Sequence, residues 1–275
     1  MNSCVRRSKV LSKLRAGKVA RIACLGHYMP YGPSMATRFG YDGIWVDGEH
    51  RAFDPLLAQA FIAFHHLADI DCVWRAVTLE KTGLYRLLED GAAGLMIPHV
   101  STVEKARMLV QAVKFPPLGD RGFDAAGLDC RYSLPALKPY GEVANRETFL
   151  VVQIETPEAL ENADAIAAVP GVDVLFLGPG DMSARLDCSP SPTDPKMAKA
   201  QDRVNAAASR HGKHWGRPVG SAEDLRRVVD AGARFVVMGS EFGGVMTEFR
   251  RCGEEFDRLL GEGAVAGVAA KPHTP

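Results

Sequence analysis

Several features are scarce or missing in this sequence. The six cysteines stand apart and form no Cys-x-x-Cys pair, the spacing that many metal and redox sites use. Isolated cysteines within apolar runs usually behave as small hydrophobic residues. We therefore expect reduced thiols and a cytoplasmic protein.

Long apolar runs are also missing. A membrane-spanning helix needs roughly 18 consecutive apolar residues, and no stretch of this chain approaches that length. The basic residues near the start, Arg6, Arg7 and Lys9, are not followed by the apolar segment of a secretory signal. We expect neither a membrane span nor secretion.

An excess of either charge is absent too. The 33 basic residues balance the 33 acidic ones, whereas nucleic acids and anionic membrane surfaces favour proteins with a basic excess. A small molecule is therefore the expected partner, rather than a nucleic acid or a membrane. The sequence also has no repeat of fixed period.

What the chain does contain is an alternation of short β-rich runs and amphipathic helical patterns, which favours a parallel sheet with helical crossovers. Its 275 residues, 47% of them hydrophobic, suit a one-domain barrel. We predict an α/β (β/α)₈ TIM barrel as a single domain over 1–275, with its core at about 17–260 and a flexible tail at 262–275. The predicted strands are Val19–Leu25, Gly43–Val46, Asp71–Ala76, Gly94–Ile97, Phe149–Ile154, Val174–Leu177, Arg217–Val219 and Phe235–Met238.

One connection between the predicted strands is unusually long. The segment from Phe115 to Thr148 is rich in Pro, Gly and Asp and exceeds the length of an ordinary loop. Long connections often carry function, so we expect this one to form a lid over the barrel mouth and to shape the substrate pocket. Three of the helices have start signals, with capping residues predicted at Ser101, Thr156 and Ser221.

Polar residues gather where the predicted strands end. The carboxyl ends of the strands meet at one face of such a barrel, and this face holds the active site in barrels of this kind. The sequence therefore predicts an active site there. The polar residues at this face are Asp47, Glu49 and His50, then Arg75, Pro98 and His99, then Gln153, Glu155 and Asp181.

Two carboxylates of this set suggest a metal. Glu155 and Asp181 each follow a predicted buried strand, and oxygen ligands suit a hard or borderline divalent ion such as Mg²⁺ or Mn²⁺. Such an ion would leave positions open for water and for a chelating 2-oxo acid. The alternative is that one of the acids only caps the helix that follows it.

His50 lies three residues after Asp47, and a carboxylate that orients an imidazole makes a good general base near neutral pH. The pattern thus suggests an Asp47–His50 dyad, although His50 could also be a turn residue bonded to backbone. Arg75 sits in an apolar run and needs a partner, because an unpaired buried guanidinium is costly. That partner is either a substrate carboxylate or enolate, which we favour, or a structural ion pair with Asp47 or Glu49.

The glycines of Gly178-Pro179-Gly180 would let backbone N–H groups approach an anionic ligand at a helix start. A plain tight turn explains the same residues equally well. For the histidines at positions 27, 99, 211 and 214 we expect ordinary surface or hydrogen-bonded roles, because they show no metal-ligand spacing.

Taken together, these motifs resemble the HpcH/HpaI aldolase family, the class II pyruvate aldolases. This family includes 2-keto-3-deoxy sugar-acid aldolases, 4-hydroxy-2-oxoheptanedioate aldolase and macrophomate synthase. The resemblance covers roughly 26–239 of this chain. Its motifs are Asp47-Gly-Glu-His50, Arg75, Pro116-Pro-Leu-Gly-Asp-Arg121-Gly122, Gln153-Ile-Glu155-Thr156 and Gly178-Pro-Gly-Asp181.

The resemblance implies roles for these residues. A divalent ion (Mg²⁺, Mn²⁺ or Co²⁺) would be held by Glu155 and Asp181, with Gln153 beside it. Arg75 would face the enolate oxygen, and His50, oriented by Asp47, would take the proton of a substrate 4-hydroxyl. Backbone at Pro179 and Gly180 would hold the pyruvate carboxylate, and Glu89 would stand where the family supplies an acid to the neighbouring subunit's site.

The resemblance also implies a barrel of the phosphoenolpyruvate/pyruvate type and a homohexamer with exchanged C-terminal helices. No Schiff-base lysine is needed, and none stands at a predicted strand end. Two departures from the family, Cys24 in place of a tryptophan and Phe123–Ala126 after the Arg121-Gly122 motif, leave the acceptor open.

We therefore predict a metal-dependent carbon–carbon lyase that forms a pyruvate enolate. It would do so by retro-aldol cleavage of a 4-hydroxy-2-oxo acid or by decarboxylation of oxaloacetate. One alternative is an enzyme like macrophomate synthase that adds the enolate to a bulkier acceptor. Others are a phosphate-binding isomerase using Gly178–Gly180 and Met238–Ser240, against which Asp181 argues, and a non-catalytic assembly subunit.

Overall fold

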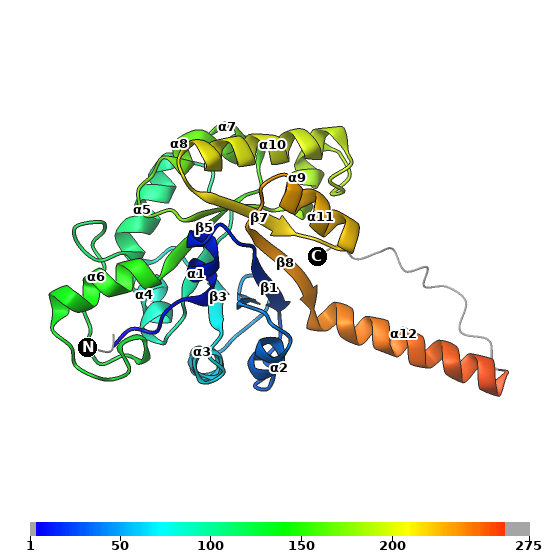
Figure 1. The fold of residues 1–275 in the computed structure, drawn as a ribbon, viewed down its shortest axis with the longest axis horizontal. Helices are drawn as coiled ribbons and strands as arrows, with labels where there is room; N and C mark the ends of the chain where they lie inside the picture. The colour runs from blue at the N-terminus through cyan, green and yellow to red at the C-terminus, as the bar shows by residue number, and fades with distance from the viewer. Residues whose placement is uncertain (1–3, 262–275) are drawn as a thin grey trace.

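The computed structural model describes residues 4–261. Eight parallel strands form a closed barrel in which each strand pairs with the next one in the chain, and β8 pairs with β1 (Figure 1). This confirms the predicted (β/α)₈ barrel. The strands are β1 (Ala20–Leu25), β2 (Gly43–Asp47), β3 (Asp71–Arg75), β4 (Gly94–Ile97), β5 (Phe149–Ile154), β6 (Val174–Leu177), β7 (His214–Pro218) and β8 (Phe235–Ser240).

Helices precede, connect and follow the strands, and most of them cover the outside of the barrel. The predicted caps at Thr156 and Ser221 are confirmed, since each side chain accepts a hydrogen bond from the first turn of its helix. The predicted cap at Ser101 was wrong by one residue, because the Thr102 side chain accepts the Lys105 N–H at the start of α5. The helices are α1 (Lys9–Arg15), α2 (Gly32–Arg38), α3 (Pro55–Leu67), α4 (Lys81–Glu89), α5 (Val103–Val113), η1 (Leu128–Cys130), α6 (Leu137–Glu147), α7 (Pro157–Glu161), α8 (Ala163–Ala167), α9 (Pro179–Leu186), α10 (Pro195–Arg210), α11 (Ala222–Asp230) and α12 (Glu241–Leu260).

The strand bounds differ from the prediction mainly at β7. This strand begins at His214, three residues before the predicted start at Arg217, because its first residues pair with β6: Val174 lies beside His214 and Leu175 beside Trp215. The sequence did not predict the first residues of β7, because they do not form an apolar run. Pairing with a buried neighbour, rather than local composition, makes this segment extended.

The alternation of side chains along each strand creates two cores, one inside the barrel and one outside it. On β2, Trp45 points into the interior, whereas Ile44 and Val46 face the surrounding helices. Each fully buried aliphatic side chain of these cores contributes about 1.5–3 kcal/mol. The interior core contains Ile22, Trp45, Val73, Met96, Phe149, Val151, Val174, Phe176, Phe235 and Val237.

Helix α1 closes the amino-terminal end of the barrel, although it precedes the predicted start of the core. Its residues Val10 and Leu14 are buried in the interior core. The carboxylate of Asp71, at the start of β3, accepts hydrogen bonds from the Ser8 hydroxyl (2.5 Å) and the Val10 N–H (2.9 Å). Helix α1 thereby covers the amino-terminal end of the barrel interior.

The long connection from Phe115 to Thr148 does not cover the mouth of its own barrel, so the lid prediction was wrong for a single chain. Helix α5 carries the chain back from the mouth, and β5 begins at the amino-terminal end, so this connection starts and ends there. Its residues Phe115, Cys130 and Tyr140 form a separate small core with Val5. The sequence showed its length but not the end of the barrel it occupies.

Helix α12 extends away from the barrel body (Figure 1), and none of its residues is buried. It exposes Val245 (49%), Phe249 (72%) and Phe256 (65%). Within the described residues, no helix has both the length and the apolar character to span a membrane. The predicted flexible tail at 262–275 lies outside the described residues.

The register of the barrel places the upper inward-facing side chains together. Asp47 of β2 and Arg75 of β3 are Cα partners in the ladder, and both follow inward-facing core residues by two positions. Gln153 follows Val151 on β5 in the same way. The polar layer predicted from sequence therefore lies directly above the apolar interior.

Candidate active site

Arg75 organises one half of the barrel mouth, which we call the β2–β3 half and define by Trp45, Asp47, Glu49, His50 and Arg75. The guanidinium contacts Asp47 Oδ1 through Nε (3.0 Å) and Nη2 (2.7 Å). Its Nη1 lies 2.8 Å from Glu49 Oε2, and its carbon is 4.6 Å from the centre of the Trp45 ring. Arg75 is thus paired within the protein, which is the structural ion pair that the sequence left open.

Asp47 holds the turn after β2 rather than the imidazole. Its Oδ1 accepts the backbone N–H groups of Glu49 and His50, both at 3.1 Å. Burial opposes ionisation, but the Arg75 guanidinium and the His50 N–H outweigh it, so the pKa of Asp47 lies below its usual value. The exposed imidazole of His50 lies 3.7 Å from Glu49 Oε2, so Glu49, and not Asp47, is its carboxylate neighbour.

A cavity of about 860 Å³ opens beside His50, between α3 and α4. Phe53 and Trp74 line it and contact each other edge to face, with ring centres 5.0 Å apart. A partly aromatic cavity therefore lies next to the exposed imidazole, of a size that could hold a small molecule.

Glu155 anchors the opposite side, the β5–β6 half, which we define by Gln153, Glu155, Gly178 and Asp181. The carboxylate is almost fully buried (3% exposed). Its Oε2 accepts from Gln153 Nε2 at 3.2 Å, and an ideal Cβ on Gly178 would lie only 2.4 Å from the same oxygen. Position 178 must therefore be glycine for Glu155 to occupy this place.

The charge of the β5–β6 half is poorly compensated. Burial raises the pKa of Glu155, the His99 N–H and imidazole oppose the rise, and the nearby carboxylates of Asp181 and Glu49 add to it. Asp181, in the first turn of α9, is half exposed and bonds Arg185 four residues later. Within residues 4–261, no three His, Cys, Asp or Glu side chains form a ready metal cluster.

The donor set of this half nevertheless suits a divalent cation. Gln153 Oε1 is buried without a hydrogen-bond partner, and it lies on the same side chain whose amide contacts Glu155. A buried carboxylate, an orphaned amide oxygen and a second acid are hard oxygen donors with surplus negative charge. Glu155 and Asp181 could hold the ion, with Gln153 able to accept from a bound water.

The turn at the start of α9 has the form of an anion site. Gly178 is the residue before the helix, and Pro179 occupies its first position. An ideal Cβ on Gly180 would meet nothing within 4 Å, so open space adjoins this backbone. N–H groups at a helix start attract anions. Proline has no N–H, so Gly180 and Asp181 are the donors closest to the turn.

His99 lies at the barrel mouth, as the sequence predicted, but its contacts there had no sequence signal. It follows β4 with φ 52°, and its N–H donates to Glu155 Oε1 at 2.7 Å. Its Nδ1 lies 3.2 Å from the same oxygen, and its Nε2 lies 3.9 Å from Glu49 Oε1. His99 therefore links the two halves of the mouth, a more specific place than the surface or hydrogen-bonded role that we expected.

Glu89 is not at the mouth of its own barrel. It ends α4, which runs from the mouth to the amino-terminal end. Burial raises the pKa of Glu89 to about 7, and Arg121 opposes the rise while Asp129 adds to it. Arg121 itself is buried and pairs with Asp129 at 2.9 Å. Within one chain, Glu89 cannot join the other predicted site residues.

Comparison with known proteins decides the family. The model of the HpcH/HpaI aldolase/citrate lyase family matches residues 29–247, a segment that contains both halves of the mouth. The chain belongs to this family. It is a carbon–carbon lyase, as the aldolase names of its relatives also indicate.

Named relatives of this HpcH/HpaI chain are bacterial aldolases. Hydroxypyruvate/pyruvate aldolase of Delftia acidovorans is 35% identical over 78% of this chain and 79% of that protein. The 5-keto-4-deoxy-D-glucarate aldolase of Escherichia coli is 32% identical over 94% of this chain and all of that protein. The crystal structure of an HpcH/HpaI aldolase from Desulfitobacterium hafniense superposes with a TM-score of 0.83 at 26% identity, covering 96% of this chain and 98% of that one.

Proposed function

We propose that this protein is a divalent-metal-dependent lyase that forms a pyruvate enolate. Its reaction would be the retro-aldol cleavage of a 4-hydroxy-2-oxo acid, the decarboxylation of oxaloacetate, or both. The observation that carries the proposal is the buried Glu155 carboxylate, which faces Asp181 and lacks a full cationic partner. A bound divalent cation would balance the negative charge of Glu155 and Asp181.

The metal would be Mg²⁺, Mn²⁺ or Co²⁺, held by Glu155 and Asp181. When bound, such an ion supplies Lewis acidity that stabilises the negative charge developing on the 2-oxo group. Gln153 would accept a hydrogen bond from a water beside it. The backbone N–H groups of Gly180 and Asp181 would bind the substrate carboxylate at the α9 start, with Pro179 fixing the turn.

In the retro-aldol direction, the bond between C3 and C4 of the substrate breaks and its electron pair becomes the enolate of pyruvate. The 4-hydroxyl proton leaves as the aldehyde forms, and His50 would accept it directly or through a water. Asp47 fixes the backbone of His50, and Glu49 neighbours the imidazole. Arg75 would direct its charge at the enolate oxygen, and protonation of C3 then yields pyruvate.

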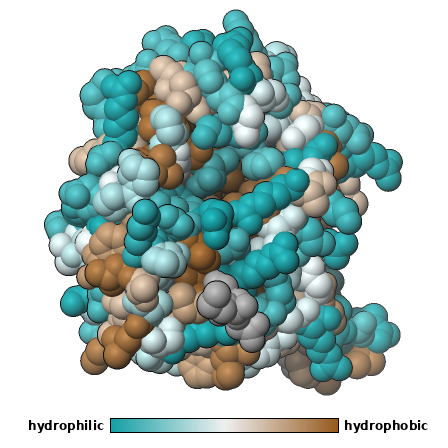
Figure 2. Space-filling view, turned by 60° about the vertical axis from the view of Figure 1, so that its left-hand side comes forward, coloured by the Kyte–Doolittle hydropathy of each residue, from teal (hydrophilic) through white to brown (hydrophobic). Residues whose placement is uncertain are grey.

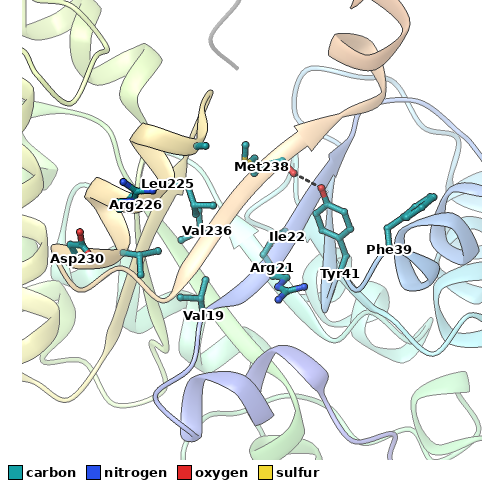
Figure 3. Close-up of a pocket in the computed structure, with 12 residues that line it drawn as sticks. Val19, Arg21, Ile22, Phe39, Tyr41, Leu225, Arg226, Asp230, Val236 and Met238 are labelled. Atoms are coloured by element: carbon teal, nitrogen blue, oxygen red, sulfur yellow. Dashed lines mark hydrogen bonds between the residues drawn. The ribbon is translucent and has the colours of Figure 1, made fainter. Parts of the chain in front are cut away.

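We further propose that the protein is a homo-oligomer, a hexamer by the family resemblance, in which α12 is exchanged between copies. An apolar groove of about 610 Å³ lies on the outer face of β8 and β1, between α11 and the segment after α2 (Figure 3). Phe39, Leu225, Val236 and Met238 line it, and the Tyr41 hydroxyl donates to Met238 O (2.9 Å) at its side. In a regular barrel the helix after β8 would cover this face.

Helix α12 of a second copy is the proposed occupant of this groove, because α12 of the same chain extends away from it. Val245, Phe249 and Phe256 of α12 are all exposed, and apolar residues at such spacing form one face of a helix. Figure 2 shows hydrophobic patches between hydrophilic residues on a further face, the one that lies on the left in Figure 1. Size-exclusion chromatography with light scattering should give an oligomer, and Phe249→Asp should shift it towards monomer.

An oligomer would also give Glu89 a role. Since it lies at the far end of its own barrel, it could act only at the mouth of another copy. Its raised pKa, about 7, would let it exchange a proton near neutral pH. A loss of activity in Glu89→Gln with intact assembly is the expected result, and unchanged turnover would remove Glu89 from the site.

Pyruvate release from oxaloacetate tests the proposed function. The purified protein should release pyruvate with Mg²⁺, Mn²⁺ or Co²⁺ and stop when EDTA is added. Full activity in the chelator would contradict the metal requirement. Because the relatives are named for hydroxypyruvate, pyruvate and a keto-deoxy sugar acid, acceptor screens should pair pyruvate and hydroxypyruvate with short and sugar-derived aldehydes.

A further inference from the structure

His99 has a backbone conformation that is unusual for its residue type. Its φ of 52° lies in the left-handed region, which costs a non-glycine residue of order 1 kcal/mol or more. It directly follows Pro98 at the end of β4, at the active-site face. Such strain persists only where the surroundings enforce it, and it concentrates at functional sites.

The surroundings of His99 do enforce this conformation. Its N–H donates to Glu155 Oε1 at 2.7 Å, and its carbonyl accepts from Lys105 Nζ at 2.8 Å. On either side, the Pro98 carbonyl accepts from the same lysine (3.2 Å), and the Val100 N–H donates to Gln153 O (3.2 Å). Hydrogen bonds to α5 and β5 thus fix the backbone that aims the imidazole.

The imidazole lies between two carboxylates of unequal burial. Nδ1 is 3.2 Å from Glu155 Oε1, and Nε2 is 3.9 Å from Glu49 Oε1. Two ligands at right angles on one small divalent ion, each about 2.1 Å from it, lie about 3 Å apart. The Nδ1–Oε1 separation therefore matches that of neighbouring ligands, and the side chain is open to the mouth at 42% exposure.

Glu49 lies close to the place that a supporting residue would need, with its Oε1 3.9 Å from Nε2 of His99, so a small shift would bring the two atoms within hydrogen-bond distance. A histidine that binds a metal through one ring nitrogen usually donates its other N–H to a carboxylate, which fixes the ring and strengthens the ligand. Glu49 faces the Nε2 of His99 while it pairs with Arg75 Nη1 at 2.8 Å. Binding through Nδ1 would leave Nε2–H for Glu49.

We propose that Nδ1 of His99 is a third protein ligand to the divalent ion of the Glu155–Asp181 site, and that this nitrogen makes the site prefer Co²⁺ to Mg²⁺. The proposal rests on the proposed metal-dependent function. Imidazole favours later transition metals, whereas Mg²⁺ prefers an all-oxygen environment. Asp181 must turn from Arg185 towards the ion to complete the site.

Calorimetric titration with Co²⁺ and with Mg²⁺ tests the preference without relying on activity. His99→Asn is the informative variant, because Asn tolerates the left-handed backbone and keeps the N–H donated to Glu155, but it is shorter. We expect it to weaken Co²⁺ binding by on the order of 10- to 100-fold and Mg²⁺ binding much less. His50→Asn, which removes another histidine of the mouth, should keep the Co²⁺ preference.

Pulsed EPR of bound Mn²⁺ tests the ligand itself. The wild-type complex and His50→Asn should show a ¹⁴N coupling of a directly bound imidazole, and His99→Asn should lose it. If Mn²⁺ binds but shows no such coupling, or if His99→Asn weakens both metals equally, His99 only positions Glu155 and the ligand proposal is overturned. If the wild type binds none of the three ions, the proposed metal-dependent function fails as well.

Discussion

The two halves of the barrel mouth are built on opposite electrostatic principles. In the β2–β3 half, the guanidinium of Arg75 bridges Asp47 and Glu49 at 2.7–3.0 Å, and the pKa of Asp47 is lowered. In the β5–β6 half, Glu155 is more deeply buried yet faces another acid, and its pKa is raised. One half is complete within the protein, and the other has a deficit of positive charge.

This difference indicates a division of labour. A half whose charges are already paired needs no reorganisation when a substrate arrives, so it can present a fixed cation to developing negative charge. In the β5–β6 half, the buried Glu155 carboxylate lies near a second acid, so a divalent cation bound between them would stabilise both charges. His99 lies between the two halves and contacts an acid on each side.

The largest effect should come from removing the charge of the incomplete half. Glu155→Gln should abolish divalent-metal binding and lower kcat/KM by on the order of 1,000-fold, because several kcal/mol of charge stabilisation would be lost. Calorimetry and the oxaloacetate assay measure the two quantities. Glu158→Gln, an exposed residue three positions later, is the matched control and should behave as wild type.

In the β2–β3 half, the next largest effect should be a loss of free energy of unfolding. Arg75→Met would leave Asp47 and Glu49 without their cation, and breaking a buried ion pair in this way costs about 3 kcal/mol. Urea denaturation near neutral pH measures the loss. Arg75→Lys keeps a charge and should recover part of it, whereas an unchanged unfolding midpoint in Arg75→Met would mean that this half is not held by its ion pairs.

Adding a methyl group at position 178 should show whether metal binding depends on the position of the Glu155 carboxylate as well as on its charge. Gly178→Ala would place its Cβ only 2.4 Å from Glu155 Oε2, so the carboxylate must move and metal affinity should fall on the order of tenfold or more. Gly180→Ala meets no atom within 4 Å and should keep the affinity. Equal affinities in the two variants would show that Glu155 does not need its present position.

Away from the mouth, Glu89 should make stability depend on pH. In the unfolded chain the pKa of this carboxyl is the ordinary glutamate value of about 4.5, whereas burial in the fold raises the pKa to about 7. The folded state therefore binds more protons in that window, and stability falls as pH rises through it. Glu89→Gln should be more stable than wild type above pH 7 by about 1 kcal/mol, allowing for solvent screening, and the difference should vanish near pH 4.5 in urea denaturation.

The smallest effect should come from Arg185, which forms an ion pair with Asp181. Arg185→Gln would free the carboxylate and remove a nearby positive charge, so Mg²⁺ affinity should rise, by less than about tenfold because exposed ion pairs are weak. Arg227→Gln breaks a similar i,i+4 pair with Glu223 on α11 and should leave the affinity unchanged. Weaker binding in Arg185→Gln would mean that Arg185 supports the site.

The barrel could be predicted from the sequence because the apolar pattern of its strands is local. Strands β4, β5 and β6 have the predicted bounds, since each is a short apolar run that needs no partner to be recognised. The convergence of Asp47, Arg75 and Gln153 followed from the alternation along parallel strands. The bounds of β7 depended on pairing with β6, which composition does not contain.

The parts that were missed depend on three-dimensional placement. Whether Asp47 would orient the imidazole or the backbone of His50 depended on the turn geometry after β2. The left-handed φ of His99 and its closeness to Glu155 had no sequence signal beyond its place after a strand. The end of the barrel occupied by 115–148 could have been found by counting α5 as a return to the amino-terminal end.

Exchange of the pyruvate methyl protons with D₂O, followed by NMR, tests most directly whether the β5–β6 half forms an enolate, because it needs no acceptor. With Mg²⁺ or Co²⁺ the methyl signal should disappear in the presence of wild-type protein, and it should persist with EDTA or with Glu155→Gln. Exchange that continues at the same rate in the chelator or the variant, or that is absent with every metal, would contradict a metal-assisted enolate site at Glu155 and Asp181.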